Sequence, residues 1–186
     1  VVYARILNLV LLANDMQPGA NNPAWTNAFA PPPLVVSIRL PNLVRVDLSE
    51  ASLDKIGHGC FQDCKSLKAV TLPTGIKHIG IHAFSCCSAL ESINLPFGLL
   101  CIDANAFVAC KSLVTISLPG SVTTVFDHAF ANCESLESVT LPEGLKLLHT
   151  GIFMGCRSLE SVTLPSSLKK LGGFAFQGCF ALRDVM

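Results

Sequence analysis

The chain has 186 residues, of which 51% are hydrophobic and 14% are charged, and thirteen acidic residues balance thirteen basic ones. So apolar a composition excludes an intrinsically disordered chain. A net charge of zero argues against nucleic acid or an anionic membrane as a partner held by bulk electrostatic attraction. No apolar run reaches the roughly 18 residues that a transmembrane helix requires, so we expect no membrane span in this segment.

Residues 1–33 are irregular, with an apolar stretch up to Leu12 followed by a region rich in Asn, Ala and Pro. A degenerate repeat start is still visible, because Phe29, Val35 and Leu40 have the same relative spacing as Phe61, Leu67 and Leu72. The end repeats of a stacked protein must hide one face of the stack. We therefore expect residues 1–33 to form an N-terminal cap or extension, whose apolar stretch packs either on the stack or on a partner.

Residues 34–186 are organised by a period of 23 residues. The two clearest columns, that is, equivalent positions in successive repeats, are Phe61, Phe84, Phe107, Phe130, Phe153 and Phe176, and Cys64, Cys87, Cys110, Cys133, Cys156 and Cys179. A period of 20–29 residues with Leu at fixed offsets is typical of a leucine-rich-repeat solenoid. The chain stops in mid-repeat, so we expect the solenoid to be truncated at its C-terminal end.

The apolar spacing within one repeat predicts its local structure. Leu67, Val70 and Leu72 indicate a short strand with Val70 and Leu72 pointing inward, and Pro73 ends the strand because it has no N–H to donate. Thr74-Gly75 is a predicted turn, and the pair Ile76 and Ile79 suits a second short extended or 3₁₀ segment. The Ala-Phe-x-x-Cys-x-x-Leu segment then returns to the next strand, and we expect a tight helical turn there.

The string L-x-x-[VI]-x-L-P-x-x-[LIV]-x-x-[ILV]-x-x-x-A-F-x-x-C-x-x-L, as in Leu90 to Leu113, resembles the BspA-like class of leucine-rich repeats. The resemblance covers residues 43–186 and, faintly, 28–41. It implies a right-handed, mostly β solenoid with a parallel sheet on one face and short strands and 3₁₀ or helical turns on the other. It also implies proteins of bacterial and protist surfaces that bind host proteins or matrix without catalysis.

The six column cysteines are predicted to be buried thiols that behave as small hydrophobes. No C-x-x-C occurs, so the spacing typical of zinc sites is missing. Unpaired thiols suit a reducing compartment, whereas the resemblance points to the cell surface, and the compartment stays open between these two.

No arrangement typical of catalysis emerges, whether a Ser/His/Asp set, a Gly-rich phosphate loop or a carboxylate pair. The five histidines are spread along the chain, and His82 and His128 lie two repeats apart, about 10 Å, which is too far for one metal. We therefore expect no enzyme activity, no cofactor and no metal.

Outward strand positions such as Thr71, Ser117 and Thr140 are predicted to form polar columns whose hydroxyls hydrogen-bond along the sheet. More informative are apolar residues at positions where the repeat does not demand them, because so many on a regular scaffold suggest a contact surface. This candidate protein-binding surface consists of Phe97, Leu100, Val108, Val114, Phe126, Leu147, Met154, Phe174 and Phe180.

The predicted function is a non-catalytic scaffold for binding another protein, adhesin-like by resemblance. The alternative is a structural subunit held inside a larger multiprotein assembly. The last repeat has no successor to cover it, so we expect a partner contact at this open C-terminal end.

Overall fold

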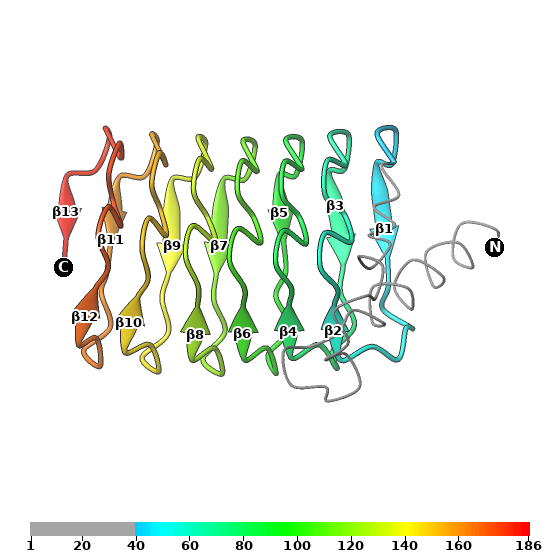
Figure 1. Ribbon diagram of the computed structural model, residues 1–186, viewed down its shortest axis with the longest axis horizontal. Helices are drawn as coiled ribbons and strands as arrows, with labels where there is room; N and C mark the ends of the chain where they lie inside the picture. The colour runs from blue at the N-terminus through cyan, green and yellow to red at the C-terminus, as the bar shows by residue number, and fades with distance from the viewer. Residues whose placement is uncertain (1–39) are drawn as a thin grey trace, which may run out of the picture.

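The computed structural model describes residues 40–186. The predicted cap over residues 1–33, and residues 34–39 of the predicted solenoid, lie outside the described residues. The described chain is a parallel β-solenoid of about six turns with no helix (Figure 1). Each repeat supplies one strand to each of two faces of the stack, as the repeat pattern predicts.

The first face is built from the odd-numbered strands, which begin two or three residues after the conserved-spacing Leu of each repeat. Their central residues, such as Val70 and Ile116, are buried, while their neighbours point outward. The strands are β1 (Arg45–Asp47), β3 (Ala69–Thr71), β5 (Ser92–Ile93), β7 (Thr115–Ser117), β9 (Ser138–Thr140), β11 (Ser161–Val162) and β13 (Asp184–Val185).

The second face is built from the even-numbered strands, which correspond to the predicted second apolar pair. The second residue of each strand except the last is buried, as at Ile79 and Val125. The strands are β2 (Lys55–Ile56), β4 (His78–Ile79), β6 (Cys101–Ile102), β8 (Thr124–Val125), β10 (Leu147–Leu148) and β12 (Lys170–Leu171).

The register of the strands follows the sequence period. Ile56 pairs with Ile79 and Val139 with Val162, both 23 residues apart, whereas Val46 of β1 pairs with Val70, 24 residues apart. The extra residue therefore lies between β1 and β2, where the sequence pattern also placed it.

Each face is interrupted once. The odd-numbered strands form one sheet of β1, β3 and β5 and another of β7, β9, β11 and β13, while the even-numbered strands divide between β8 and β10. The two interruptions fall at different steps of the stack, because β6 still pairs with β8 where β5 and β7 do not pair, and β7 still pairs with β9 where β8 and β10 do not.

A proline closes each strand of the first face with a turn. The carbonyl of Pro96 accepts a hydrogen bond from Leu99 N–H at 3.0 Å, and that of Pro119 accepts one from Val122 N–H at 2.9 Å. The residues between them, such as Phe97 and Gly98, form the predicted turn. The proline thus ends the strand and turns the chain toward the second face.

The return segment around each Phe consists of successive turns and not of the expected helical turn. His82 and Cys86, on either side of Phe84, have φ of 57° and 61°, and the corresponding residues of the next repeat, Asn105 and Ala109, have 57° and 59°. Two left-handed residues so close together are incompatible with a right-handed helix. The N–H of Phe84 instead donates to the Ala106 carbonyl of the next repeat at 2.8 Å.

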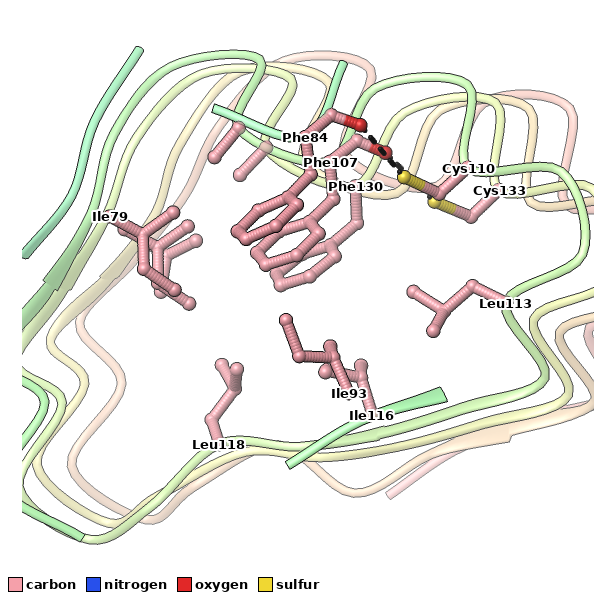
Figure 2. Close-up of a cluster of buried hydrophobic side chains, with 14 of the residues drawn as sticks. Ile79, Phe84, Ile93, Phe107, Cys110, Leu113, Ile116, Leu118, Phe130 and Cys133 are labelled. Carbon is pink, nitrogen blue, oxygen red and sulfur yellow. Dashed lines mark hydrogen bonds between the residues drawn. The ribbon is translucent and has the colours of Figure 1, made fainter. Parts of the chain in front are cut away.

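The phenylalanine column fills the centre of the stack (Figure 2). Adjacent rings from Phe61 to Phe176 are stacked with centroids 5.1–5.8 Å apart and planes within 13° of parallel. Such aromatic pairs contribute about 0.5–1.5 kcal/mol beyond the burial of their area. Each repeat is therefore stabilised mainly by its neighbours.

Candidate protein-binding surface

The outer side of the first face is covered by small polar side chains. No side-chain hydrogen bond joins these residues along their columns between residues 40 and 186, so the predicted ladder of hydroxyl hydrogen bonds is wrong. At strand spacing the short Ser and Thr side chains point away from the sheet into solvent. They are Thr71, Asn94, Ser117, Thr140 and Thr163 in one column and Ser92, Thr115, Ser138 and Ser161 in the other, all exposed.

The nine predicted apolar residues do not form one surface, because the fold distributes them over three regions. Four of them, which we call the lateral patch, come from three consecutive repeats and lie along the second face and the turn that leads into it. The lateral patch consists of Phe97, Leu100, Phe126 and Leu147. Phe97, in the turn between β5 and β6, is 84% exposed, and Leu100 and Phe126 are 42% and 37% exposed.

Phe126 is held in place by its neighbours in the next repeat. Its ring contacts the imidazole of His149 with centroids 5.1 Å apart. His149 Nδ1 lies 3.6 Å from Asp127 Oδ1, and the same carboxylate oxygen accepts a hydrogen bond from Thr150 N–H at 2.9 Å. The lateral patch therefore includes an exposed aromatic ring whose position is fixed by packing. The sequence pattern gave no sign of this arrangement, because the two residues are 23 apart.

Three predicted residues lie elsewhere and are less exposed. Val108 and Met154 each follow a buried Phe in the return segment and are half-buried, and Val114 precedes β7 on the polar first face and is 37% exposed. The structure therefore separates them from the lateral patch.

The last two, Phe174 and Phe180, belong to the final repeat and are 64% and 81% exposed. The sequence pattern missed that Leu171 and Val185, which occupy inward columns, are also 55% and 49% exposed. They are exposed because no following repeat covers them. Ile81, 41% exposed, was also missed, although it occupies a variable position of the kind that identified the others.

The six column cysteines lie inside the stack, each beside the phenylalanine column. Cys110 Sγ donates a hydrogen bond to the Phe84 carbonyl at 3.2 Å, and Cys133 Sγ donates to the Phe107 carbonyl at 3.3 Å (Figure 2). Cys87, Cys156 and Cys179 make the equivalent bonds at 3.1 Å. All nine cysteines are free thiols. The column thus ties each repeat to the backbone of the preceding one.

Burial makes these thiols difficult to ionise. It raises the pKa of Cys110 and of Cys133, and it raises the pKa of Cys179 to about 11. Hydrogen bonding with the Cys133 side chain, followed by burial, raises the pKa of Cys156. A thiol that stays protonated is neither a good nucleophile nor a good metal ligand.

The histidines do not assemble a metal site. Within residues 40–186, no group of three or more His, Cys, Asp or Glu side chains is placed to hold a metal ion. His82 Nδ1 and His128 Nδ1 are buried and have no hydrogen-bond partner among the described residues. In the same part of the chain, no helix has the length and apolarity that crossing a membrane would take.

The two stacked faces, the short parallel strands and the repeated Leu, Pro, Phe and Cys columns define a leucine-rich-repeat solenoid. Six copies of the BspA type leucine rich repeat region match residues 39–154, and the chain belongs to this family. The resemblance seen in the sequence is therefore confirmed.

Two solved structures share the fold at substantial identity. A leucine-rich repeat protein from Bacteroides ovatus is 36% identical with a TM-score of 0.76, over 80% of this chain and 38% of that one. A T. pallidum leucine rich repeat protein is 40% identical with a TM-score of 0.74, over 77% of this chain and 66% of that one. The chain thus spans less than two thirds of the length of both. A comparison with curated proteins gave no match.

Proposed function

We propose that the chain is a non-catalytic scaffold that binds another protein through the lateral patch, and that it acts in an adhesin-like manner. Leucine-rich-repeat proteins commonly bind other proteins and are generally non-catalytic. The observation that carries the proposal is the position of Phe97 and Phe126 on one side of a rigid stack, beside Leu100 and Leu147, where the fold does not need them.

Exposed aromatic residues on a rigid backbone are well suited to binding. Aromatic side chains are enriched among the residues that dominate interface energies. The ring of Phe126 is already held by His149, so less conformational freedom is lost on binding than for a mobile side chain. The polar first face offers no comparable anchor.

The proposal is tested with a panel of purified host and extracellular-matrix proteins, whose binding to the immobilised chain is measured by interferometry. We expect at least one panel member to bind the wild type. The double substitution Phe97→Ser and Phe126→Ser should weaken that binding by at least about thirtyfold, as expected for the loss of about 2 kcal/mol at an anchor position.

Val114→Ser serves as the matched control, since it removes an exposed apolar residue from the opposite, polar face and should leave the affinity unchanged. Circular dichroism melts would verify that all variants remain folded. Binding by no panel member contradicts the adhesin-like role, and equal binding by the double variant contradicts the lateral patch.

A second candidate function, that of a subunit within a larger assembly, is favoured by the final repeat. There Phe174 and Phe180 are exposed together with Leu171 and Val185. An apolar flank beside the unpaired edge of β13 promotes association with another chain. On this proposal, the partner contact is at the open end and not on the lateral patch.

A further inference from the structure

The outer side of the second face has a hollow of about 270 Å³ near its N-terminal end. Its lining includes Lys55 of β2, His78 of β4 and His58, with Gly57 and Gly80 between them and Asp103 from the next repeat. Lys55 and His78 are paired in register on adjacent strands, so their side chains emerge side by side on one face. The hollow is thus formed by three repeats of the second face.

Glycine creates the hollow. The column that contains Gly57 and Gly80 continues as Asp103, Phe126 and His149, so side chains fill this position in the later repeats. A Cβ on Gly80 would lie 2.9 Å from the carbonyl oxygen of Ile56, which is closer than real Cβ contacts allow. The close approach of the two backbones therefore excludes a side chain, and the space above them stays open.

The charge of the hollow depends on its imidazoles. With neutral histidines, the ammonium group of Lys55 and the carboxylate of Asp103 offset each other, and protonation of His58 and His78 then adds two positive charges. The other polar groups around it are the thiol of Cys101, which donates to Asp103 Oδ1 at 3.5 Å, and His82, whose ring lies 6.0 Å from that of His58. Asp54 and Lys77, just before the two strands, carry opposite charges.

We propose that this hollow binds a carboxylate and does so more tightly as the pH falls, with Lys55, His58 and His78 as the cationic donors. On the function proposed above, on which this assignment of the source rests, the carboxylate is an Asp or Glu side chain of the protein partner. The hollow and the lateral patch share the second face, so one partner can contact both.

The direction of the pH dependence follows from the two titrations. Imidazoles ordinarily gain a proton as the pH falls through about 6.5, whereas a Glu side chain stays ionised down to about 4.3. Opposite charges therefore coexist between these values, and binding strengthens across that window. Burial, and secondarily the neighbouring His58, lower the pKa of His82, so His82 is the last of the three to become charged.

The test uses the full chain and a short blocked peptide with a single Glu, and its counterpart with Gln in place of Glu. Affinities are measured by NMR titration at pH 7.5 and 5.5, with the histidine ring signals as reporters. We expect the Glu peptide to bind at least about fivefold tighter at pH 5.5, since each participating imidazole changes from mostly neutral to mostly protonated. The Gln peptide should not bind at either pH.

Two variants separate charge from shape. The exposed pair His58→Gln and His78→Gln should abolish the gain at low pH, whereas His58→Lys with His78→Lys should give tight binding at both pH values. His149→Gln, on the same face in a filled repeat, is the matched control and should change nothing. Propionate as a free ligand distinguishes a small carboxylate from a peptide side chain: propionate binding as tight as that of the peptide overturns the assignment to a protein partner.

The proposal is overturned if both peptides bind alike, if the His-to-Gln pair retains the pH dependence, or if Zn²⁺ binds in place of the peptide and is lost in the same pair. The double variant Phe97→Ser and Phe126→Ser leaves the hollow intact and should still bind the peptide. Failure of the carboxylate site is therefore distinguishable from failure of the lateral patch.

Discussion

At the scale of single residues, the unusual feature of this protein is its regular use of left-handed backbone. In each repeat, one residue before the buried Phe and one after it have φ near +60°, and the first column runs through Gly59, His82, Asn105, His128, Gly151 and Phe174. A left-handed conformation costs a residue other than glycine about 1–2 kcal/mol. The fold accepts this cost because the alternative, a helical turn, would remove the backbone hydrogen bonds between repeats.

Ala109 offers a direct test of that cost, since its φ is 59° and its side chain is only half-buried. We expect Ala109→Gly to raise the free energy of unfolding by about 0.5–1 kcal/mol, because relief of strain exceeds the added entropy of the unfolded chain. A thermal melt should show an increase of a few degrees. The control Ala106→Gly, at a fully buried residue without positive φ, should lower stability by about 1 kcal/mol. A decrease in both would contradict the strain argument.

The left-handed columns also explain which part of the local structure could not be predicted. Inward positions such as Val70 and Leu72 followed from apolar spacing alone. The left-handed positions are occupied by Gly, His, Asn, Asp, Cys, Ala and Phe, so no residue type marks them. A helical turn was therefore a reasonable prediction from the Ala-Phe spacing, and the backbone strain that excludes it is invisible in the sequence.

At the scale of the repeat, the cysteine column joins neighbouring repeats through S–H···O bonds and not through covalent bonds. The thiol hydrogen of Cys110 or Cys133 is required for that contact, so the column depends on protonated sulfur. The interior is apolar, and a thiolate there would be unpaired and poorly solvated. This dependence makes the stack sensitive to alkali.

We expect stability to fall steeply above about pH 9. Because folding raises the pKa of the buried thiols, the folded state keeps protons that the unfolded state releases, so stability is complete below the unfolded pKa and is lost as the pH rises toward the folded one. Each buried thiol should cost about 1.4 kcal/mol per pH unit in that range. Denaturant melts between pH 8 and 10.5 measure this directly.

The variant Cys110→Ala removes one buried thiol and should make the alkaline loss shallower by about one proton. Cys86→Ala, at a half-buried cysteine outside the column, is the control and should change the slope less. An alkaline slope identical in the wild type and in Cys110→Ala would show that the column thiols are not responsible.

At the scale of the whole molecule, the open flank of the final repeat distinguishes the two proposed functions. In hydrogen exchange, amides of Ser158–Val185 should exchange faster than those of the central repeats when the chain is isolated, because one side of this repeat has no neighbour. In material from the native source, the same amides should be protected if another polypeptide covers the flank. Equal and strong protection in both samples would show that the end needs no cover, and would remove the main support for the subunit function.

The candidate site was predictable only in part. Phe97 and Leu100 were identifiable because a strict period makes any exception visible, and the same argument selected residues on all sides of the stack. Which exceptions share a side depends on where the two faces turn, as Val114 and Phe126 illustrate by lying on opposite faces. The contact of Phe126 with His149, and the hollow at Gly80, depend on side chains that meet across repeats, and no local pattern encodes them.

The staggered interruption of the two faces has a mechanical consequence. A solenoid in which both sheets ended at the same step would have a hinge there, and its two halves could rock against each other. In this protein β6–β8 pairing bridges the step between β5 and β7, and β7–β9 pairing bridges the step between β8 and β10. The molecule should therefore resist bending along its whole length, so that widely separated repeats keep a fixed spacing and present their side chains to a partner as one template.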